Sequence, residues 1–213
     1  SGNQPGNGSG SSNSDNDSAS AKATATKTIS KSSKTLSGSY TSKKSDQSVV
    51  LVKNSGTLTL NNAVLNKLSG DSSNTENSEF YGINAGLLVT TKSTANVTNA
   101  KITTSAKGSN AVFATGTNAK INISDSTITT TGSSSARGLD ATYGGTIYAD
   151  NVTVSTSGNS CASLATDRGE GTVTAKNSTL STKGTGSPVI YSTGKISISN
   201  TTGTASGSQM VVI

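Results

Sequence analysis

The side chains with the greatest chemical potential lie in two short runs near the middle of the chain. Together the runs contain two arginines, a tyrosine and three carboxylates: Arg137, Asp140, Tyr143, Asp167, Arg168 and Glu170. A guanidinium matches the planar geometry of a carboxylate, so the arginines can bind an acidic sugar. Carboxylate oxygens are the ligands that Ca²⁺ prefers in proteins. We therefore predict a ligand-binding site at these six residues, with Ca²⁺ held by Asp140, Asp167 and Glu170 as the one candidate metal. The alternative is that the acids and arginines only pair with one another at a corner of the fold.

Catalysis is not expected from these residues. The chain has no histidine and no tryptophan, and among these six residues the only close acidic pair is Asp167 and Glu170. Inverting glycoside hydrolysis needs two carboxyl groups about 6.5–9.5 Å apart, one with a raised pKa. Asp140 and Asp167 can meet that distance, but the sequence shows no apolar pocket around them. Serine and threonine abound without a base to activate them as nucleophiles. We therefore predict that the protein is not an enzyme. Of the three candidate functions, a polysaccharide lyase-like enzyme ranks last.

A repeated pattern predicts the elements that position these residues. Two apolar residues alternate with polar ones and are followed by an Asn or Asp, at Asn62, Asn99, Asp125, Asn151, Asn177 and Asn200, so the intervals are 37, 26, 26, 26 and 23 residues. Such alternation is the period of a strand with one buried face. Asn and Asp tolerate left-handed backbone, so each marks a short turn. A period of this length predicts a solenoid. We predict an all-β fold, a parallel β-helix of about seven rungs, with the Asn side chains stacked as a ladder inside the corner.

Composition agrees with a narrow, repetitive core. Only 30% of residues are hydrophobic and 3% are aromatic. A spherical globule would be difficult to stabilise with so few apolar residues in its core. A β-helix needs less, because small aliphatic side chains fill its core while the backbone pairs between rungs.

Each of four rungs has a second apolar run, which predicts a second strand. These runs are 111–114, 138–141, 162–165 and 188–191. Aligning them places Asp140 beside Leu164 on the next rung, and Tyr143 near Asp167. The sequence does not decide which residues of these strands face inward.

The same alignment stacks four residues of successive rungs in one column: Phe113, Asp140, Leu164 and Ile190. If this column faces outward, it is unusually apolar and is either a contact surface or is covered by a loop such as the insert at 69–81. A glycine also recurs four residues beyond the last apolar position of four rungs, at Gly132, Gly158, Gly184 and Gly207. A fixed glycine column indicates a corner that requires positive φ or close backbone approach.

Outward positions of the first strand predict a flat hydroxyl surface. Around the third apolar position the outward pairs are Lys101/Thr103, Thr127/Thr129, Thr153/Ser155, Thr179/Ser181 and Thr202/Thr204. Stacked rungs turn these pairs into two columns, which can match ice or a polysaccharide fibre. The simpler interpretation is that threonine suits exposed strand positions.

The ends of the chain differ from the repeats. Residues 1–22 are rich in Ser, Gly and Asn, which predicts a disordered tether, such as the spacer behind a bacterial lipoprotein anchor. The β-helix is then expected over 23–213 and beyond 213 in a longer protein.

Residues 1–67 carry eight lysines and three aspartates, a net charge of +5. This charge favours anionic neighbours such as wall polymers, or simply protects a sheet edge. Scarce arginine and aromatic residues argue against nucleic acid, and no stretch is long and apolar enough to span a membrane.

The Asn ladder, the rungs of about 23–26 residues and the runs 137–142 and 165–170 resemble the right-handed parallel β-helix surface proteins of Gram-positive bacteria, which are similar to pectate-lyase-type solenoids. The resemblance implies an adhesin or a carbohydrate-binding module. We predict a non-enzymatic protein, secreted or anchored at the bacterial cell surface, that binds polysaccharide or a cell-wall or host glycan. The second choice is a stalk or filament subunit that self-associates through the apolar edge at 209–213.

Overall fold

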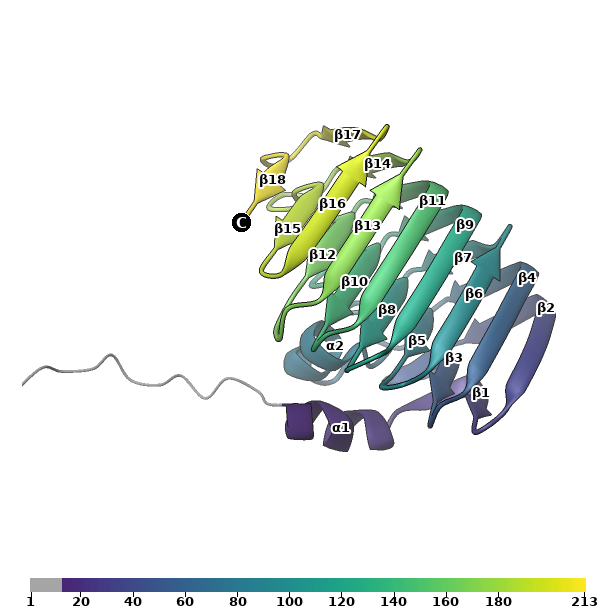
Figure 1. Ribbon diagram of the computed structural model, residues 1–213. Helices are drawn as coiled ribbons and strands as arrows, with labels where there is room; N and C mark the ends of the chain where they lie inside the picture. The colour runs from purple at the N-terminus through teal and green to yellow at the C-terminus, as the bar shows by residue number, and fades with distance from the viewer. Residues whose placement is uncertain (1–12) are drawn as a thin grey trace, which may run out of the picture.

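The protein is a parallel β-solenoid of about seven turns, as seen in a computed structural model that describes residues 13–213 (Figure 1). This confirms the predicted all-β solenoid. Every strand pairs in parallel with the strand one rung away, and the strands form two long sheets, called sheet A and sheet B below.

Sheet A contains the second, shorter strand of each rung. In spatial order it consists of β1 (Thr24–Ser30), β3 (Gln47–Lys53), β5 (Leu87–Val89), β8 (Val112–Thr115), β10 (Leu139–Thr142), β12 (Leu164–Thr166), β15 (Ile190–Ser192) and β18 (Val211–Val212).

Sheet B contains the repeated pattern itself and bends at each Asn or Asp. Its strands are β2 (Ser33–Ser42), β4 (Thr57–Lys67), β6 (Thr94–Thr98), β7 (Lys101–Thr104), β9 (Lys120–Thr130), β11 (Thr146–Thr156), β13 (Thr172–Lys176), β14 (Thr179–Thr182), β16 (Lys195–Ser199) and β17 (Thr202–Ala205).

The core is a set of columns that run along the solenoid. The first apolar position of each repeat pairs with its equivalent on the next rung, in the order Leu58, Ala95, Ile121, Ile147, Val173 and Ile196. The first five are fully buried. Burying such a Leu, Ile or Val side chain contributes about 1.5–3 kcal/mol, so one small aliphatic per rung adds up along the axis.

The Asn ladder exists, but it lies on the outer surface and is interrupted. All six Asn or Asp residues have left-handed backbone, as predicted. Their side chains are exposed, whereas we expected them inside the corner. The amide of Asn99 donates to Asn62 Oδ1 (2.6 Å) and that of Asn151 to Asp125 Oδ1 (2.8 Å). Asn177 instead donates to Asp150 Oδ1 (2.9 Å). The residue after each Asn turns inward, which directs the amide outward.

A different polar column lies inside the solenoid. Thr104, Thr130 and Thr156 are buried, and each hydroxyl donates to a main-chain carbonyl five or six residues later, at 2.8, 2.6 and 2.6 Å. Lys67 occupies the equivalent place one rung earlier, and its ammonium donates to Gln47 O (2.8 Å) and Ser42 Oγ (3.2 Å). Burial lowers the pKa of Lys67 to about 8, and the charges of Asp46 and Asp71 oppose that fall.

A second apolar layer covers the outside of sheet A. Helix α2 (Thr75–Tyr81) comes from the insert, begins after the N-cap Asn74 and ends at Gly82, which has left-handed backbone. Tyr81 and Ile83 pack with Phe113, whose side chain is fully buried outside the solenoid. The column through Phe113 therefore faces outward, and the insert covers it, which settles the two alternatives in favour of a covering segment.

The register of this outer column differs from our alignment by one residue. Asp140 pairs with Phe113 as predicted, but its partner on the following rung is Ala165 and not Leu164. The next step of the alignment is correct, because Leu164 pairs with Ile190 and Ala165 with Tyr191, so the outer column continues through Ala165 to Tyr191. Since side chains alternate between faces, a shift of one residue exchanges the inner and outer sets.

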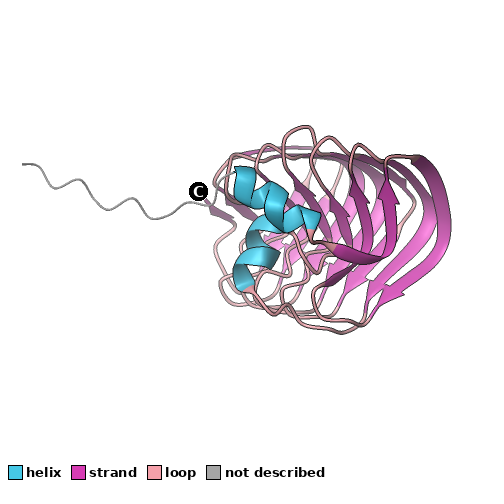
Figure 2. Ribbon diagram, turned by 90° about the horizontal axis from the view of Figure 1, so that it is seen from below, coloured by secondary structure: helices cyan, strands magenta, loops and turns pink. Residues whose placement is uncertain are grey.

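Helix α1 (Asn13–Ala21) is a second difference from the sequence prediction. We expected a disordered tether through residue 22, but residues 13–21 are helical and lie beside α2, outside sheet A (Figure 2). Two hydrogen bonds tie the helix to the solenoid: Asn16 is buried and accepts from Thr115 Oγ1 (2.9 Å), and Asp17 accepts from Thr91 Oγ1 (3.1 Å). The rest of the predicted tether, residues 1–12, lies outside the described residues.

The glycine column marks close backbone approach and not positive φ. Gly132, Gly158, Gly184 and Gly207 do not have left-handed backbone. A Cβ atom on Gly158 would overlap the carbonyl oxygen of Gly132, and one on Gly184 would overlap that of Gly158. Glycine is thus required here because successive corners touch through their main chains.

Replacing Gly158 with alanine should therefore destabilise the solenoid by at least about 3 kcal/mol, the upper range for overpacking. Gly186→Ala is the control, because its Cβ meets only Ser160 Oγ at 4.0 Å and its cost is that of left-handed backbone, about 1–2 kcal/mol. Denaturant unfolding of both variants measures the difference. An equal loss in the two would contradict the stacking explanation.

Candidate functional site

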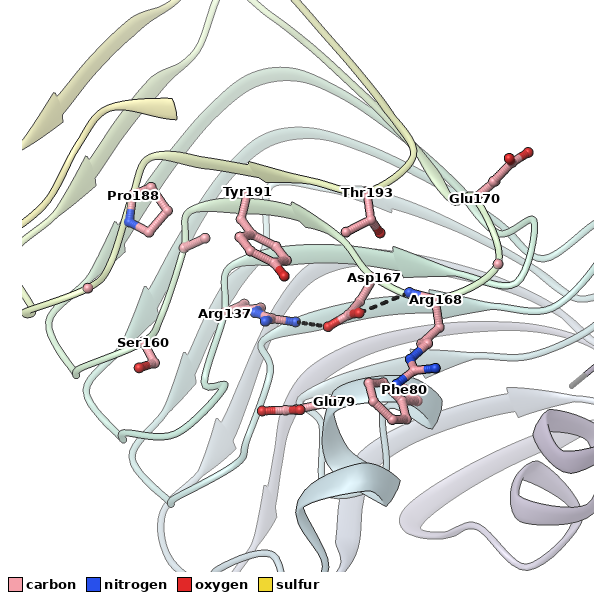
Figure 3. Close-up of a pocket in the computed structure, with 13 residues that line it drawn as sticks. Glu79, Phe80, Arg137, Ser160, Asp167, Arg168, Glu170, Pro188, Tyr191 and Thr193 are labelled. Atoms are coloured by element: carbon pink, nitrogen blue, oxygen red, sulfur yellow. Dashed lines mark hydrogen bonds and ion pairs between the residues drawn. The ribbon is translucent and has the colours of Figure 1, made fainter. Parts of the chain in front are cut away.

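A hollow on the surface outside sheet A lies where the predicted arginines and acids meet helix α2. Its volume is about 670 Å³. Three successive rungs and α2 supply its wall, which consists of Glu79, Phe80, Arg137, Ser160, Ala162, Asp167, Arg168, Gly169, Glu170, Gly186, Pro188, Tyr191 and Thr193 (Figure 3).

Arg137 is the centre of this pocket. It lies just before β10, and its backbone N–H donates to Asn110 Oδ1 (3.0 Å) on the previous rung. The Nη1 atom of its guanidinium lies 3.2 Å from Asp140 Oδ2 and 3.0 Å from Asp167 Oδ2. The guanidinium carbon also lies 5.2 Å from the centre of the Tyr191 ring, which is cation–π geometry. One cation is thus shared by two carboxylates and an aromatic ring.

Asp140 lies behind Arg137 and does not form part of the pocket wall. Its side chain is fully buried, and its Oδ1 atom has no hydrogen-bond partner. Burial raises the pKa of Asp140 to about 7, because the carboxylate loses its water. Arg137 opposes that rise, whereas the negative charges of Asp167 and Glu79 add to it. Asp140 therefore holds Arg137 in place but cannot touch a ligand directly.

Arg168 and Glu170 lie on the turn after β12. The Arg168 guanidinium stacks on Phe80 of helix α2, 4.4 Å from the ring centre. The backbone N–H of Arg168 donates to Asp167 Oδ1 (3.0 Å), so the Asp167 carboxylate is held from both sides. Glu170 has left-handed backbone, and Figure 3 shows its side chain directed away from Arg137 and Asp167. Arg168 is the guanidinium of the pocket that is not tied to an acid.

Tyr143 is a packing residue. Its ring is buried and stacks on that of Tyr81, with centroids 5.9 Å apart and planes 14° from parallel. We expected it near Asp167, but its backbone N–H donates to the carbonyl of Arg168 (2.8 Å), one residue further on. Of the predicted residues, the structure thus brings Arg137, Asp167, Arg168 and Glu170 to the wall, and places Asp140 behind it and Tyr143 beneath α2.

The predicted Ca²⁺ ligands do not fit a metal site. Among the described side chains, residues 16–213, no group of three acidic, histidine or cysteine residues is arranged to hold a metal ion. Arg137 supplies the positive charge between Asp140 and Asp167, and Glu170 points elsewhere. The structural alternative, in which acids and arginines pair, describes Arg137, Asp140 and Asp167.

Among the pocket residues that sequence reasoning missed are its two aromatic rings, Tyr191 and Phe80, and the carboxylate of Glu79. Tyr191 follows directly from the correct register, because it stands two rungs from Asp140 in the same outer column. Phe80 and Glu79 arrive on α2, and only its acidic and aromatic composition indicated that the insert was unusual.

The predicted hydroxyl surface is present on sheet B. Thr127, Thr153, Thr179 and Thr202 pair in register from β9 to β17, and the column two residues later continues as Thr129, Ser155, Ser181 and Thr204. The first column is exposed throughout. Neighbouring rungs place equivalent hydroxyls about 4.8 Å apart, so the surface is regular over these strands.

No protein-family model, curated protein or solved structure matches this chain. The solenoid fold accordingly stands on the structure itself, and the predicted likeness to Gram-positive surface proteins stays a prediction. Among the helices that the structure describes, neither has the length and apolar character needed to cross a bilayer.

Asp140 should make the protein less stable as the pH rises from about 4 to about 7. In that window the folded carboxyl, with its pKa near 7, keeps a proton that the unfolded chain, with the ordinary value of 3.8, has lost. Stability falls with pH wherever the folded state binds more protons. In Asp140→Asn this contribution disappears, so the free energy of unfolding of the variant, relative to the original chain, should rise by an amount on the order of a few kcal/mol between about pH 4 and pH 8.

Urea unfolding across that pH range measures the effect. Asp150→Asn is the matched control, since Asp150 is about half exposed, lies 3.7 Å from the Lys176 ammonium and accepts a hydrogen bond from the Asn177 amide (2.9 Å). If both variants follow the original chain at every pH, Asp140 does not titrate in this window.

Proposed function

We propose that this protein is a non-enzymatic binding protein of the cell exterior that recognises a glycan through the pocket around Arg137. The observation that carries the proposal is the wall of that pocket. It combines an oriented aromatic ring, Tyr191, with an unpaired guanidinium, Arg168, and the hydroxyl groups of Ser160 and Thr193. A few fixed polar groups around an aromatic surface are typical of small-ligand sites, and saccharides present both hydroxyls and apolar C–H faces.

Charge favours a neutral or mixed glycan over a polyacid. Two arginines and three carboxylates form the wall, so its formal charge is 2 − 3 = −1. Arg137 is already neutralised by Asp140 and Asp167, which leaves Arg168 for the ligand. An acidic sugar would meet Glu79 and Asp167 as well as that single cation. We therefore replace the acidic sugar that the sequence suggested with a neutral one.

The hydroxyl surface of sheet B extends the proposal to a polymer. Its exposed threonine column carries no charge from β9 to β17. Many weak contacts along such a face add avidity to a chain that the pocket selects. Threonine is also a favourable exposed strand residue, so the pocket and not this surface carries the proposal.

Absence of catalysis is part of the proposal. A general acid must lie within hydrogen-bond reach of the leaving atom, and the carboxyl group whose pKa is raised, Asp140, is shielded by Arg137. Asp167 is held by Arg137 and by the Arg168 N–H, so its carboxylate is not free to act as a general base. The sequence has no histidine to take that role.

The pocket predicts a specific pattern of binding losses. Tyr191→Ala removes the ring that faces Arg137, and Arg168→Gln removes the free guanidinium, so each should weaken retention on the recognised glycan at least about tenfold. The probes are a panel of insoluble neutral polysaccharides and wall preparations, with pectate as an acidic comparison, and the readout is depletion of protein from solution.

Tyr148→Ala is the control for this experiment. Tyr148 is 48% exposed on β11 of sheet B, so the same truncation is made outside the pocket. Loss of binding in Tyr148→Ala but not in Tyr191→Ala would contradict the proposed site. Retention on none of the polymers would refute glycan binding, and release of soluble saccharides would refute the non-enzymatic part.

The second candidate function is a stalk or filament, and one observation supports it. The last rung exposes Ile198, Met210, Val211 and Ile213. A head-to-tail filament would place this rung on the first one, where Lys27 and Lys34 occupy the core columns of Val50 and Leu58. Burying these charges without partners is costly. Self-association through 209–213 is therefore the weaker proposal.

A direct measurement separates the two candidates. If the edge drives assembly, the sedimentation coefficient of the 1–213 chain should rise with concentration, and Val211→Lys should abolish that rise because it adds a charge to the exposed strand. A monomer at all concentrations would rule out assembly through this edge.

A further inference from the structure

The first rung of the solenoid has an unusual register. β1 and β2 each pair with a strand on one side only, so they form the end of sheet A and of sheet B (Figure 1). Lys27 pairs with Val50, and Lys34 pairs with Leu58. Val50 and Leu58 are fully buried core residues. Lysines thus stand where every later rung has an apolar side chain.

Because no rung within the described part of the chain covers them, both lysines are exposed despite their core register. Their side chains begin over the end of the core, so the aliphatic stems cover it while the ammonium groups reach solvent. The charges of Lys27 and Lys34 therefore emerge from the end face of the solenoid and not from its sides.

Other lysines surround this end face. Lys22 precedes β1, Lys31 lies in the turn between β1 and β2, and Lys43 and Lys44 follow β2; all four are exposed. A single rung of a solenoid lies across the axis, so the six charges are spread over one plane. Residues 18–45 contain these six lysines and no acidic residue.

The nearby carboxylates are engaged elsewhere. Asp46 accepts hydrogen bonds from the backbone N–H (2.9 Å) and the hydroxyl of Ser73, and Asp17 accepts from Thr91. Among the side chains of residues 16–213, none of the six lysines forms an ion pair. Their charge is available to an external partner.

We propose that this end face, defined by Lys22, Lys27, Lys31, Lys34, Lys43 and Lys44, docks on a planar anionic surface, specifically an anionic lipid bilayer. Cations spread over two dimensions match fixed anions that are also spread over a plane, whereas one polymer chain meets only those that follow a line. Each lysine close to an anionic membrane strengthens binding about fivefold, and the effect decays within a Debye length. The proposal is independent of the glycan pocket.

Vesicle co-sedimentation of the full 1–213 chain tests it. Vesicles of phosphatidylcholine with one-third phosphatidylglycerol should bind the chain at about 0.1 M salt, and binding should disappear at about 1 M salt, where the Debye length falls from about 10 to about 3 Å. Vesicles of phosphatidylcholine alone should not bind it.

The double variant Lys27→Gln, Lys34→Gln should weaken the partition onto anionic vesicles about 25-fold, from two losses of about fivefold. The matched control, Lys120→Gln with Lys183→Gln, removes two exposed lysines from later rungs and should bind within about twofold of the original chain. Circular dichroism and thermal unfolding confirm that both variants fold.

Three outcomes would overturn the proposal. They are no binding to anionic vesicles, equal losses in the two double variants, or capture by soluble polyglutamate with no binding to vesicles. The first would leave the lysines as protection of an open sheet edge, and the last would identify a polymer as the partner.

Discussion

Backbone pairing between successive rungs is the constraint on which this structure depends. Each strand must match the main chain of its neighbour in parallel register, and every side chain then stands directly above an equivalent one. The residue type at each position of the repeat is therefore repeated along the axis as a column. The columns include an aliphatic core, an internal row of threonine hydroxyls and an outer row of amides. The glycine corners show how tight the constraint is, because their main chains leave no room for a single methyl group.

The same constraint explains why the pocket is unusual within the fold. Three different rungs contribute Arg137, Asp167 and Tyr191, and only the strict stacking brings them together. A buried arginine shared by two acids is expensive to desolvate, and removing one partner from such a set is more damaging than replacing the whole set. Asp140, with a carboxylate oxygen left unpaired, shows that the arrangement is not optimised for stability. Buried ionisable residues that carry such a cost are candidates for function.

Sequence reasoning succeeded where the pattern is local and repeated. Alternation around Ile121 and Ile147, with Asp125 and Asn151 at the bends, is enough to define strands, rungs and core. It failed where the outcome depends on loop length or on distant contacts. The corner before β12 decides that Asp140 meets Ala165, and a one-residue error there concealed Tyr191. No local rule places α2 over Phe113, since that packing joins residues far apart in the chain. The direction of the bend at each Asn, which puts the ladder outside, is likewise set by the inward turn of the following residue.

The 26-residue spacing of the central rungs has a consequence for how such a chain can change its length. Loss or duplication of one complete unit between Asp125 and Asn177 leaves every backbone partner in register, so the core and the hydroxyl surface would shorten or grow by one row with their chemistry intact. The pocket does not share this freedom. Its members belong to particular rungs, and inserting a unit between Arg137 and Asp167 would separate them by an additional strand spacing, about 4.8 Å. Length can therefore vary by recombination in this architecture, whereas the position of the pocket relative to α2 is fixed by the rungs that build it.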